Sequence, residues 1–288
     1  MFSDLIDKGL VKESHQNGLY VYKYAKKVFY DNLWHLDDRL LEARGIILDA
    51  KGNIIHRPFK KVFNLNENGV TVDRDKEVLA VRKVNGFMGA VSYHNGYNLY
   101  GTTGSTVSDF AKLAEQEISK AGLHVKPNYT YLFEIVHPSD PHIVEEEVGV
   151  YLIGRRDIRT GSLAPERLLD HLAEGTGMKR PETVLGRFSD ILAASKDVKH
   201  EGFMIVDPDT NEHLCKIKSK HYSSKKFLMR MGNQKVHGFF RTPDHVKQKC
   251  DEEFYPIIDK IIANHSEESW TKLTDQQRRE YIEEYVSY

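Results

Sequence analysis

A lysine at the end of an apolar strand is the first group in this sequence that suggests covalent chemistry. The apolar run Val78-Leu79-Ala80-Val81 leads into Lys83-Val84-Asn85-Gly86, and a second alternating run follows. The glycine lets a phosphate approach the backbone, and an uncharged lysine amine can attack phosphorus. Later come Glu201-Gly202 and Lys216-Ile217-Lys218. In this order they supply a nucleophile, a metal-binding carboxylate and two cations for phosphate oxygens.

Neither short motif is specific by itself. Lys235-Val236-His237-Gly238 also fits the pattern Lys-x-x-Gly, and Glu174-Gly175 repeats the Glu-Gly pair. We discount Lys235 because no strand is expected before it and no matching strand after it. The hypothesis therefore depends on the combination of motifs, their order and their strand context.

A nucleophilic lysine must lose its charge. From a reference pKa of ~10.4, the pKa has to fall by roughly 2–3 units. One cation about 5 Å away contributes ~3 kcal/mol at an effective dielectric near 20, so two positive neighbours, or one plus a metal, suffice. Lys216 and Lys218 alternate along a strand and share a side. The hairpin register leaves open whether Glu201 shares it, and an edge-strand charge pair is the ordinary alternative.

Two glutamates are candidates for a nucleotide site. Glu201 fits a magnesium ion, which favours one or two carboxylates plus substrate phosphates, although a surface strand-end glutamate has the same appearance. Glu134 lies in the apolar run Leu132-Phe133-Glu134-Ile135-Val136 and therefore needs a partner. A ribose hydroxyl or a structural arginine would serve equally.

Basic and aromatic residues are concentrated in the second half of the chain. The net charge is −1, yet residues 213–243 carry eight Lys or Arg and no acid, whereas residues 251–288 carry ten acids and four bases. Cations and rings alternate at Lys220, Tyr222, Lys225, Lys226, Phe227, Arg230, Phe239 and Arg241. Such interleaving fits single-stranded nucleic acid, whose bases stack on rings, although phenylalanines there are more often core residues.

Composition indicates an ordinary globular protein. The 288 residues are 40% hydrophobic and 29% charged, with two cysteines. We expect a reduced, cytoplasmic protein with no membrane span and no secretory signal.

The periodicity predicts an α+β fold of mainly antiparallel strands flanked by helices. Expected strands or hairpins cover residues 18–29, 46–55, 88–101, 131–136, 148–153 and 202–218, and expected helices cover 105–121, 165–172, 189–194, 254–262 and a last helix ending at 286 that Thr274 and Gln277 cap. We expect one domain over residues 1–238 and a small all-helical domain over 239–288.

Together these residues resemble the ATP-dependent RNA ligases of the phage RNA ligase 1 branch, in the covalent nucleotidyltransferase superfamily. The likeness covers roughly residues 18–226. The shared stretches, in family order, are Arg44-Gly45-Ile46, residues 57–67, Lys83-Val84-Asn85-Gly86, Phe133-Glu134 with Ile143-Val144, Glu201-Gly202 and Lys216-Ile217-Lys218-Ser219. Phe63-Asn64-Leu65-Asn66-Glu67 and residues 216–219 are the most specific to this branch.

The resemblance implies a role for each matching residue. Lys83 would be the adenylylated nucleophile, Glu134 the ribose contact and Glu201 the metal ligand. Lys216, Lys218 and Arg44 would be further catalytic residues that also contact ATP, and the remaining ATP contacts would be Lys61, Phe63 and Tyr22. RNA contacts would be Tyr222, Lys225, Lys226 and Arg230.

The resemblance further implies ATP and Mg²⁺ or Mn²⁺ as cofactors, and single-stranded, nicked or broken RNA as the partner, with a cut tRNA in RNA repair as one case. No membrane and no obligate protein partner are expected. Two features depart from the branch: Asn85 replaces a common acidic residue, and Thr103 stands where a lysine usually precedes Gly104-Ser105. The alternatives are a DNA ligase or capping-type enzyme, and a non-catalytic RNA-binding module.

Overall fold

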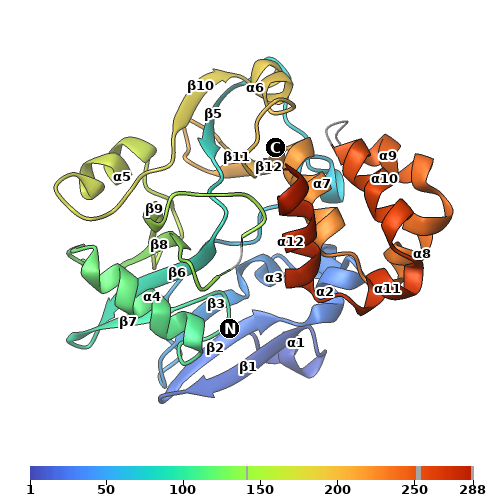
Figure 1. Ribbon diagram of the computed structural model, residues 1–288. Helices are drawn as coiled ribbons and strands as arrows, with labels where there is room; N and C mark the ends of the chain where they lie inside the picture. Colours follow the sequence, from blue (N-terminus) through green and yellow to red (C-terminus); the bar gives the residue numbers. More distant parts are fainter. Residues whose placement is uncertain (141, 251–253, 287–288) are drawn as a thin grey trace.

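The protein is described by a computed structural model over residues 1–140, 142–250 and 254–286. Figure 1 shows a body of sheets with covering helices, and a group of helices on one side of it. The body holds three sheets of four antiparallel strands, which confirms the predicted fold class. Within the part of the chain that is described, no helix has the length and apolar character needed to cross a membrane.

The N-terminal segment forms the first sheet. Its strands, in order, are β1 (Val11–Gln16), β2 (Leu19–Tyr24), β3 (Arg44–Leu48) and β4 (Ile54–His56). Packed with them are α1 (Ser3–Asp7), α2 (Lys26–Tyr30), the 3₁₀ helix η1 (Leu33–Leu36) and α3 (Arg39–Glu42). The predicted hairpin of β3 and β4 is confirmed. The predicted strand at 18–29 is β2, which ends earlier because the chain continues into α2.

The second sheet carries the nucleophile motif. Its strands, in order, are β10 (Thr183–Arg187), β5 (Glu77–Arg82), β11 (Gly202–Val206) and β12 (His213–Lys218), and α6 (Phe188–Ala194) packs on it; the 3₁₀ helix η2 (Glu67–Gly69) precedes β5. Val78 and Ala80 of β5 are fully buried, as their apolar run predicts. Strand β10 was not predicted, because Val184 and Leu185 are exposed and give no alternating pattern.

The third sheet completes the body. Its strands, in order, are β7 (Tyr97–Gly101), β6 (Phe87–His94), β8 (Tyr129–Val136) and β9 (Gly149–Asp157), with α4 (Asp109–Lys120) and α5 (Glu166–Ala173) against it. Asn95 and Gly96 have φ values of 47° and 88°, as a tight hairpin turn requires. Helix α4 begins later than predicted because the Ser108 hydroxyl accepts the Ala111 N–H at 3.2 Å and caps it.

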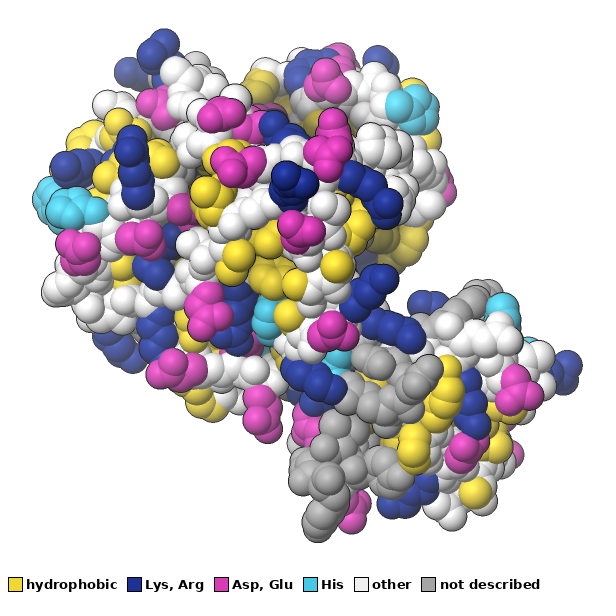
Figure 2. Space-filling model, turned by 90° about the horizontal axis from the view of Figure 1, so that it is seen from above, with side chains coloured by type: hydrophobic (Ala, Val, Ile, Leu, Met, Phe, Trp, Pro, Cys, Tyr) yellow, Lys and Arg dark blue, Asp and Glu magenta, His cyan; other side chains and the backbone are white. Residues whose placement is uncertain are grey.

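The described part of the chain after β12 is mainly helical. It consists of α7 (Lys220–Met229), α8 (Asn233–Arg241), α9 (Pro243–Lys249), α10 (Tyr255–Asn264), α11 (Glu267–Lys272) and α12 (Asp275–Val286). We call these helices the helical lobe, and Figure 2 shows it standing out from the body. The predicted cap of α12 is confirmed: the Gln277 side chain accepts the Thr274 N–H, and the Thr274 hydroxyl accepts the Gln277 N–H.

The predicted division at residue 238 stays a prediction. Residue 238 lies inside α8, and the lobe's buried cluster already includes Tyr222, Leu228 and Met229 of α7. Of the predicted C-terminal domain, residues 251–253 and 287–288 lie outside the described residues. The last strand ends at Lys218, so helical packing begins well before the boundary that the sequence suggested.

A buried ion network ties the first sheet to the third. Glu42, at the end of α3, accepts two hydrogen bonds from Arg156 of β9 at 2.7 and 2.8 Å. Arg57 donates to the same carboxylate at 3.1 Å. Arg156 is only 4% exposed and also donates to the backbone oxygens of Pro58 and Gly161. Glu42 is therefore the counter-charge for the buried Arg156 and the partly buried Arg57.

Replacing Glu42 with alanine should lower the free energy of unfolding by about 3–5 kcal/mol, because it leaves a buried guanidinium without its carboxylate. Urea unfolding measures this loss. Glu212→Ala is the matched control, since its ion pair with Lys60 is about 40% exposed on both sides and should contribute less than about 1 kcal/mol. Equal losses in the two variants would contradict a structural role for the Glu42 network.

Candidate active site

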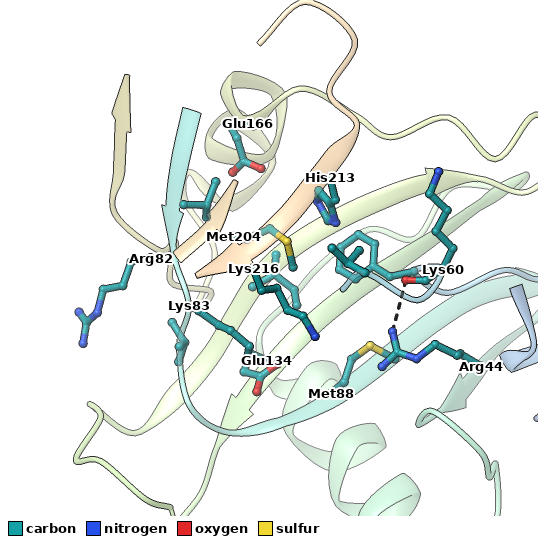
Figure 3. Close-up of a pocket in the computed structure, with 15 residues that line it drawn as sticks. Arg44, Lys60, Arg82, Lys83, Met88, Glu134, Glu166, Met204, His213 and Lys216 are labelled. Atoms are coloured by element: carbon teal, nitrogen blue, oxygen red, sulfur yellow. Dashed lines mark hydrogen bonds between the residues drawn. The ribbon is translucent and has the colours of Figure 1, made fainter. Parts of the chain in front are cut away.

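A cavity of about 260 Å³ lies where the second and third sheets face each other. Figure 3 shows Lys83, Glu134 and Lys216 converging at one end of it, with Glu166 at the other. Its lining residues are Arg44, Phe59, Lys60, Val62, Val81, Arg82, Lys83, Val84, Met88, Glu134, Ile153, Glu166, Met204, His213 and Lys216. Charged side chains thus lie at both ends, and apolar side chains line much of the space between them.

Lys83 follows directly after β5. Its backbone N–H donates to the carbonyl of Gly202 at 2.9 Å, which extends the pairing of β5 with β11. Arg82 points away from the cavity in Figure 3 and pairs with Glu146 at 2.7 Å. The Lys83 side chain is 24% exposed, and its Nζ lies 3.1 Å from Glu201 Oε2. The structure therefore brings together the predicted nucleophile and the predicted metal ligand.

The register of β11 and β12 resolves what the sequence left open. Gly202 pairs with Lys218, and Met204 pairs with Lys216. Glu201, just before β11, is 3% exposed, and its Oε1 lies 3.7 Å from Lys218 Nζ. Gly202 has a φ of 133°, and a Cβ there would lie 2.0 Å from the carbonyl oxygen of Ile217. The glycine of the Glu-Gly pair is thus required by the close approach of the two strands.

Asn85 connects the nucleophile motif to the rest of the site. Its Nδ2 donates to Glu201 Oε2 at 2.9 Å. Its Oδ1 accepts the backbone N–H groups of Ile143 and Val144 at 2.9 and 3.3 Å. An aspartate at this position could not donate to Glu201. The departure from the acidic residue of the family therefore has a structural use.

Glu134 finds its partner in the nucleophile motif itself. The N–H of Gly86 donates to Glu134 Oε1 at 3.0 Å. A Cβ on Gly86 would lie 2.3 Å from the carbonyl oxygen of Ile135, so only glycine allows this approach. Burial raises the pKa of Glu134, and the charge of Lys83 partly opposes the rise. The second oxygen of this carboxylate is left for another donor, as a ribose hydroxyl would be.

Lys83 and Lys216 have opposite electrostatic environments. Burial lowers the pKa of Lys83, but Glu134 and Glu201 outweigh it and the net shift is upward. The pKa of Lys216 falls to about 7, first through burial and then through the charges of Lys61, Lys218, Arg44 and Lys83. The expectation of an uncharged Lys83 beside positive side chains is wrong for this structure. Two carboxylates hold Lys83 as an ammonium ion, and the lowered pKa belongs to Lys216.

The predicted phosphate contacts Arg44 and Lys61 approach Lys216 from the first sheet. Arg44 lines the cavity, and its guanidinium donates to the carbonyl of Lys60 at 3.3 Å. Lys61 Nζ lies 3.6 Å from Glu67 and within 5.7 Å of three ring centroids: Phe29, Trp34 and Phe63. Phe63 also accepts the Lys216 N–H on its carbonyl at 2.9 Å. The branch-specific segment therefore lies directly beside β12.

The predicted RNA contacts divide into two groups. Tyr222 is buried with Lys218 and Lys226 over its ring at 5.2 and 5.7 Å, next to the site. Arg230 is exposed at the end of α7. Lys225 faces the other way, where its Nζ lies 3.7 Å from Glu283 of α12. The structure therefore brings three of the four toward the opening of the site.

Tyr22, the predicted adenosine contact, is not brought to the cavity. It is buried in the first sheet with its ring 5.1 Å from that of Phe2. Its neighbour Lys23 was missed: it is exposed and pairs in register with Arg44. A Cβ on Gly104 would lie 3.3 Å from Lys23 Nζ. Lys23 thus reaches the loop where Thr103 stands in place of the family lysine, and only the pairing of β2 with β3 reveals it.

The apolar part of the cavity was also missed as a site. Phe59 packs on His213 with ring centroids 4.7 Å apart, and burial lowers the pKa of His213 to about 4, so that imidazole is neutral. A Cβ on Gly154 would lie 2.3 Å from the Phe59 ring. Apolar residues with these roles have no distinctive spacing in the sequence.

The free energy of unfolding should depend on pH because folding lowers the pKa of Lys216. The pKa of Lys216 is about 7 in the folded state and higher in the unfolded state. At pH values between these two, the unfolded state binds more protons than the folded state, so the free energy of unfolding rises with pH in this range. We expect Lys216→Met to be more stable than the wild type at pH 7, and this difference to shrink by about 1–2 kcal/mol by pH 9.

Urea unfolding of both proteins at several pH values measures this difference. Lys196→Met, at an exposed lysine, is the matched control, and its difference from the wild type should not vary with pH. A constant difference for Lys216→Met would show that Lys216 is an ordinary charged lysine.

Comparisons with known proteins agree with this geometry. A family model described as RNA ligase matches residues 42–227. Archaeal ATP-dependent RNA ligase is similar in form 2 (TM-score 0.57, 15% identity, 99% of this chain and 75% of that chain) and form 1 (0.53, 14%, 98% and 75%). A putative ATP-dependent DNA ligase from Aquifex aeolicus is similar as well (0.51, 13%, 99% and 74%). At these identities the structures share the fold alone.

A search among curated proteins found no match. The family match is the decisive one, because it spans more than half of the chain and includes Arg44, Lys83, Glu134, Glu201 and the Lys216–Lys218 pair. This chain belongs to the RNA ligase family.

Proposed function

We propose that this RNA ligase uses ATP to join a 5′-phosphate and a 3′-hydroxyl end, through AMP bound covalently to Lys83 and then through adenylylated RNA. The observation that carries the proposal is the contact between the Lys83 amine and Glu201 at one end of a nucleotide-sized cavity, with Lys216 and Lys218 alongside. Three groups of different function that lie far apart in the sequence converge there.

ATP would lie along the cavity. The apolar side chains around Phe59, Ile153 and Met204 suit a purine ring, and Glu134 would accept a hydrogen bond from a ribose hydroxyl. The phosphates would then lie among Arg44, Lys216 and Lys218. Because phosphate binding favours the protonated form of Lys216, whose pKa is about 7, affinity for the triphosphate should fall above neutral pH.

Three transfers follow from this arrangement. Lys83 Nζ, once deprotonated, attacks the α-phosphorus; a P–N bond forms, and the bond to the β-phosphate breaks as pyrophosphate leaves with the electron pair. An oxygen of the RNA 5′-phosphate then attacks the same phosphorus, and Lys83 recovers its electron pair and takes up a proton. Finally the 3′-hydroxyl attacks the RNA phosphorus, loses its proton and displaces AMP. Positioning and charge neutralisation by the protein serve all three steps.

Glu201 fits a divalent cation as one ligand among waters and phosphates. Among the residues that the structure describes, no group of three or more acidic, histidine or cysteine side chains forms a closed metal site. Mg²⁺, or Mn²⁺ in its place, needs only one or two carboxylates when substrate phosphates complete its shell. Bound there, the cation would supply positive charge that offsets Glu201. That offset matters because Glu201 helps to keep Lys83 protonated.

The alternatives are less well supported. A DNA ligase or capping enzyme typically has an oligonucleotide-binding barrel of about five strands after the lysine pair. Over the described residues beyond β12, this chain is helical. A non-catalytic RNA-binding module would not need Lys83 and Glu201 in contact. We also propose that the chain divides into an adenylyltransferase domain (1–238) and a helical domain (239–288), and that it repairs broken RNA, such as a cut tRNA, in the cytoplasm.

Covalent labelling tests the nucleophile. Purified protein incubated with ATP radiolabelled at the α-phosphate and Mg²⁺ should gain AMP, and Lys83→Ala should abolish the label because it removes the amine that would form the bond to phosphorus. Lys235→Ala, at the second Lys-x-x-Gly match, is the control and should label normally, since Lys235 lies on α8. Label that survives in Lys83→Ala would move the nucleophile elsewhere.

The polynucleotide is tested with the adenylylated protein. We expect AMP transfer to 5′-phosphorylated RNA at least tenfold faster than to DNA of the same sequence, if a 2′-hydroxyl is read at the ends. Both transfers are measured by gel shift of the 5′-labelled strand. Equal rates, or faster transfer to DNA, would favour the DNA ligase alternative.

A further inference from the structure

Two large aromatic side chains are exposed on α2, beside the candidate site. Phe29 is 49% exposed and Tyr30 is 75% exposed, and their rings pack edge to face with centroids 5.5 Å apart. Val28 between them and the sheet is fully buried, so α2 is anchored while these two rings face outward. Lys26, in the same helix, is also exposed. Nothing in the three transfers proposed above uses these rings.

Lys61 lies between the aromatic pair and the other cations of the site. Lys61 Nζ lies 5.7 Å from the Phe29 ring centroid and 4.8 Å from that of Phe63, whose carbonyl accepts the Lys216 N–H. The charges of Lys218 and Arg44 act on Lys61. Lys61 thus lies near Phe29 of the exposed pair and also near the cations of the proposed phosphate site.

A row of cations continues from Lys61 along the opening. Lys218 Nζ and Lys226 Nζ lie 5.2 and 5.7 Å from the centroid of the Tyr222 ring. The charge of Lys218 helps to lower the pKa of Lys61, and the charges of Lys218 and Arg230 help to lower the pKa of Lys226. In Figure 2, Lys and Arg side chains gather along the notch between the body and the helical lobe. Like charges held near one another are stabilised by an anionic strand, and exposed rings at the end of such a row suit its bases.

The in-line geometry of the proposed transfers decides which part of the RNA would lie beside Lys61. In an in-line displacement, the entering and leaving groups lie on opposite sides of the phosphorus. Pyrophosphate therefore leaves on the side opposite Lys83, and the RNA 5′-phosphate must later attack from that same side, because Lys83 is then the leaving group. If Lys61 and Arg44 hold pyrophosphate in the first transfer, they hold the RNA 5′-phosphate in the second.

We propose that Phe29 and Tyr30 form a stacking platform for the bases next to the 5′-phosphate of the donor RNA. The assignment of the RNA 5′ end to this platform rests on the proposed function, because the in-line argument assumes AMP on Lys83. Its occupant is single-stranded nucleic acid rather than a protein, since the rings adjoin a row of cations that already ends at a phosphate site.

Binding of labelled RNA tests the platform without relying on catalysis. A 5′-phosphorylated RNA carrying the fluorescent base 2-aminopurine at its first or second nucleotide should be quenched on binding the wild type. Phe29→Ala with Tyr30→Ala should remove the quenching and weaken binding about tenfold or more. Tyr30→Trp should restore both. The matched control is Tyr93→Ala with Tyr97→Ala, at exposed tyrosines on the β6–β7 hairpin, which should bind as the wild type does.

Kinetics of the separate transfers provide the second measurement. In Tyr30→Ala, labelling by ATP should stay within about threefold of the wild type, because the cage of Lys61 is left intact. The KM for RNA in AMP transfer should rise about tenfold, while the rate at saturating RNA stays nearly unchanged. Thermal melting of each variant confirms folding.

The outcomes separate the two proposals. Loss of quenching in the double variant, with no ATP labelling in any protein, would support the platform and remove the proposed function. Normal ATP labelling, with RNA bound and adenylylated as in the wild type by the double variant, would overturn the platform and leave the function intact. A folded Tyr30→Ala that loses ATP labelling would also overturn the platform, because Tyr30 would then belong to the ATP site.

Discussion

The site depends on one buried carboxylate. Glu201 is 3% exposed and is shared by Lys83 and Asn85 on one oxygen and by Lys218 on the other. A charge so far from water is tolerated only with close counter-charges and donors, so these three side chains have little freedom to move. The contact with Glu201 fixes the Lys83 amine in place and is one of the interactions that raise its pKa. If Lys83 is the nucleophile that we propose, its amine has to leave Glu201 before it attacks.

Strand ends and glycines bring these groups together. The β5 strand ends at Arg82, and alternation sends that arginine to Glu146 and Lys83 to the cavity. Gly86 and Gly202 each allow a backbone oxygen of a neighbouring strand within a distance that any Cβ would forbid. The glycines of the Lys-x-x-Gly and Glu-Gly motifs are therefore required by close backbone contacts. Lys216 completes the set as an amine near its titration point, ready to gain a proton when an anion arrives.

Most strands and most residues of the site could be predicted from the sequence. The features that could not be predicted each have a physical reason. Continuous or alternating apolar runs predicted β5, β6, β8, β11 and β12, and therefore the positions of Lys83, Glu134, Glu201 and Lys216 along their strands. The register of β11 with β12 was not readable, because a slip of one residue preserves the same pattern. The sign of the pKa shift of Lys83 was missed since it depends on distances to two carboxylates. Lys23, Phe59 and the exposed strand β10 have no pattern of their own, and Tyr22 was misplaced because an aromatic residue on a strand is equally at home in the core.

Asn85 links the helical lobe to the carboxylate beside Lys83. Its amide oxygen accepts the N–H groups of Ile143 and Val144, whose side chains are embedded among the buried residues of the lobe. Its amide nitrogen holds Glu201. Any displacement of the lobe relative to the body would therefore act on Glu201, and through it on the Lys83 amine, by way of a single amide.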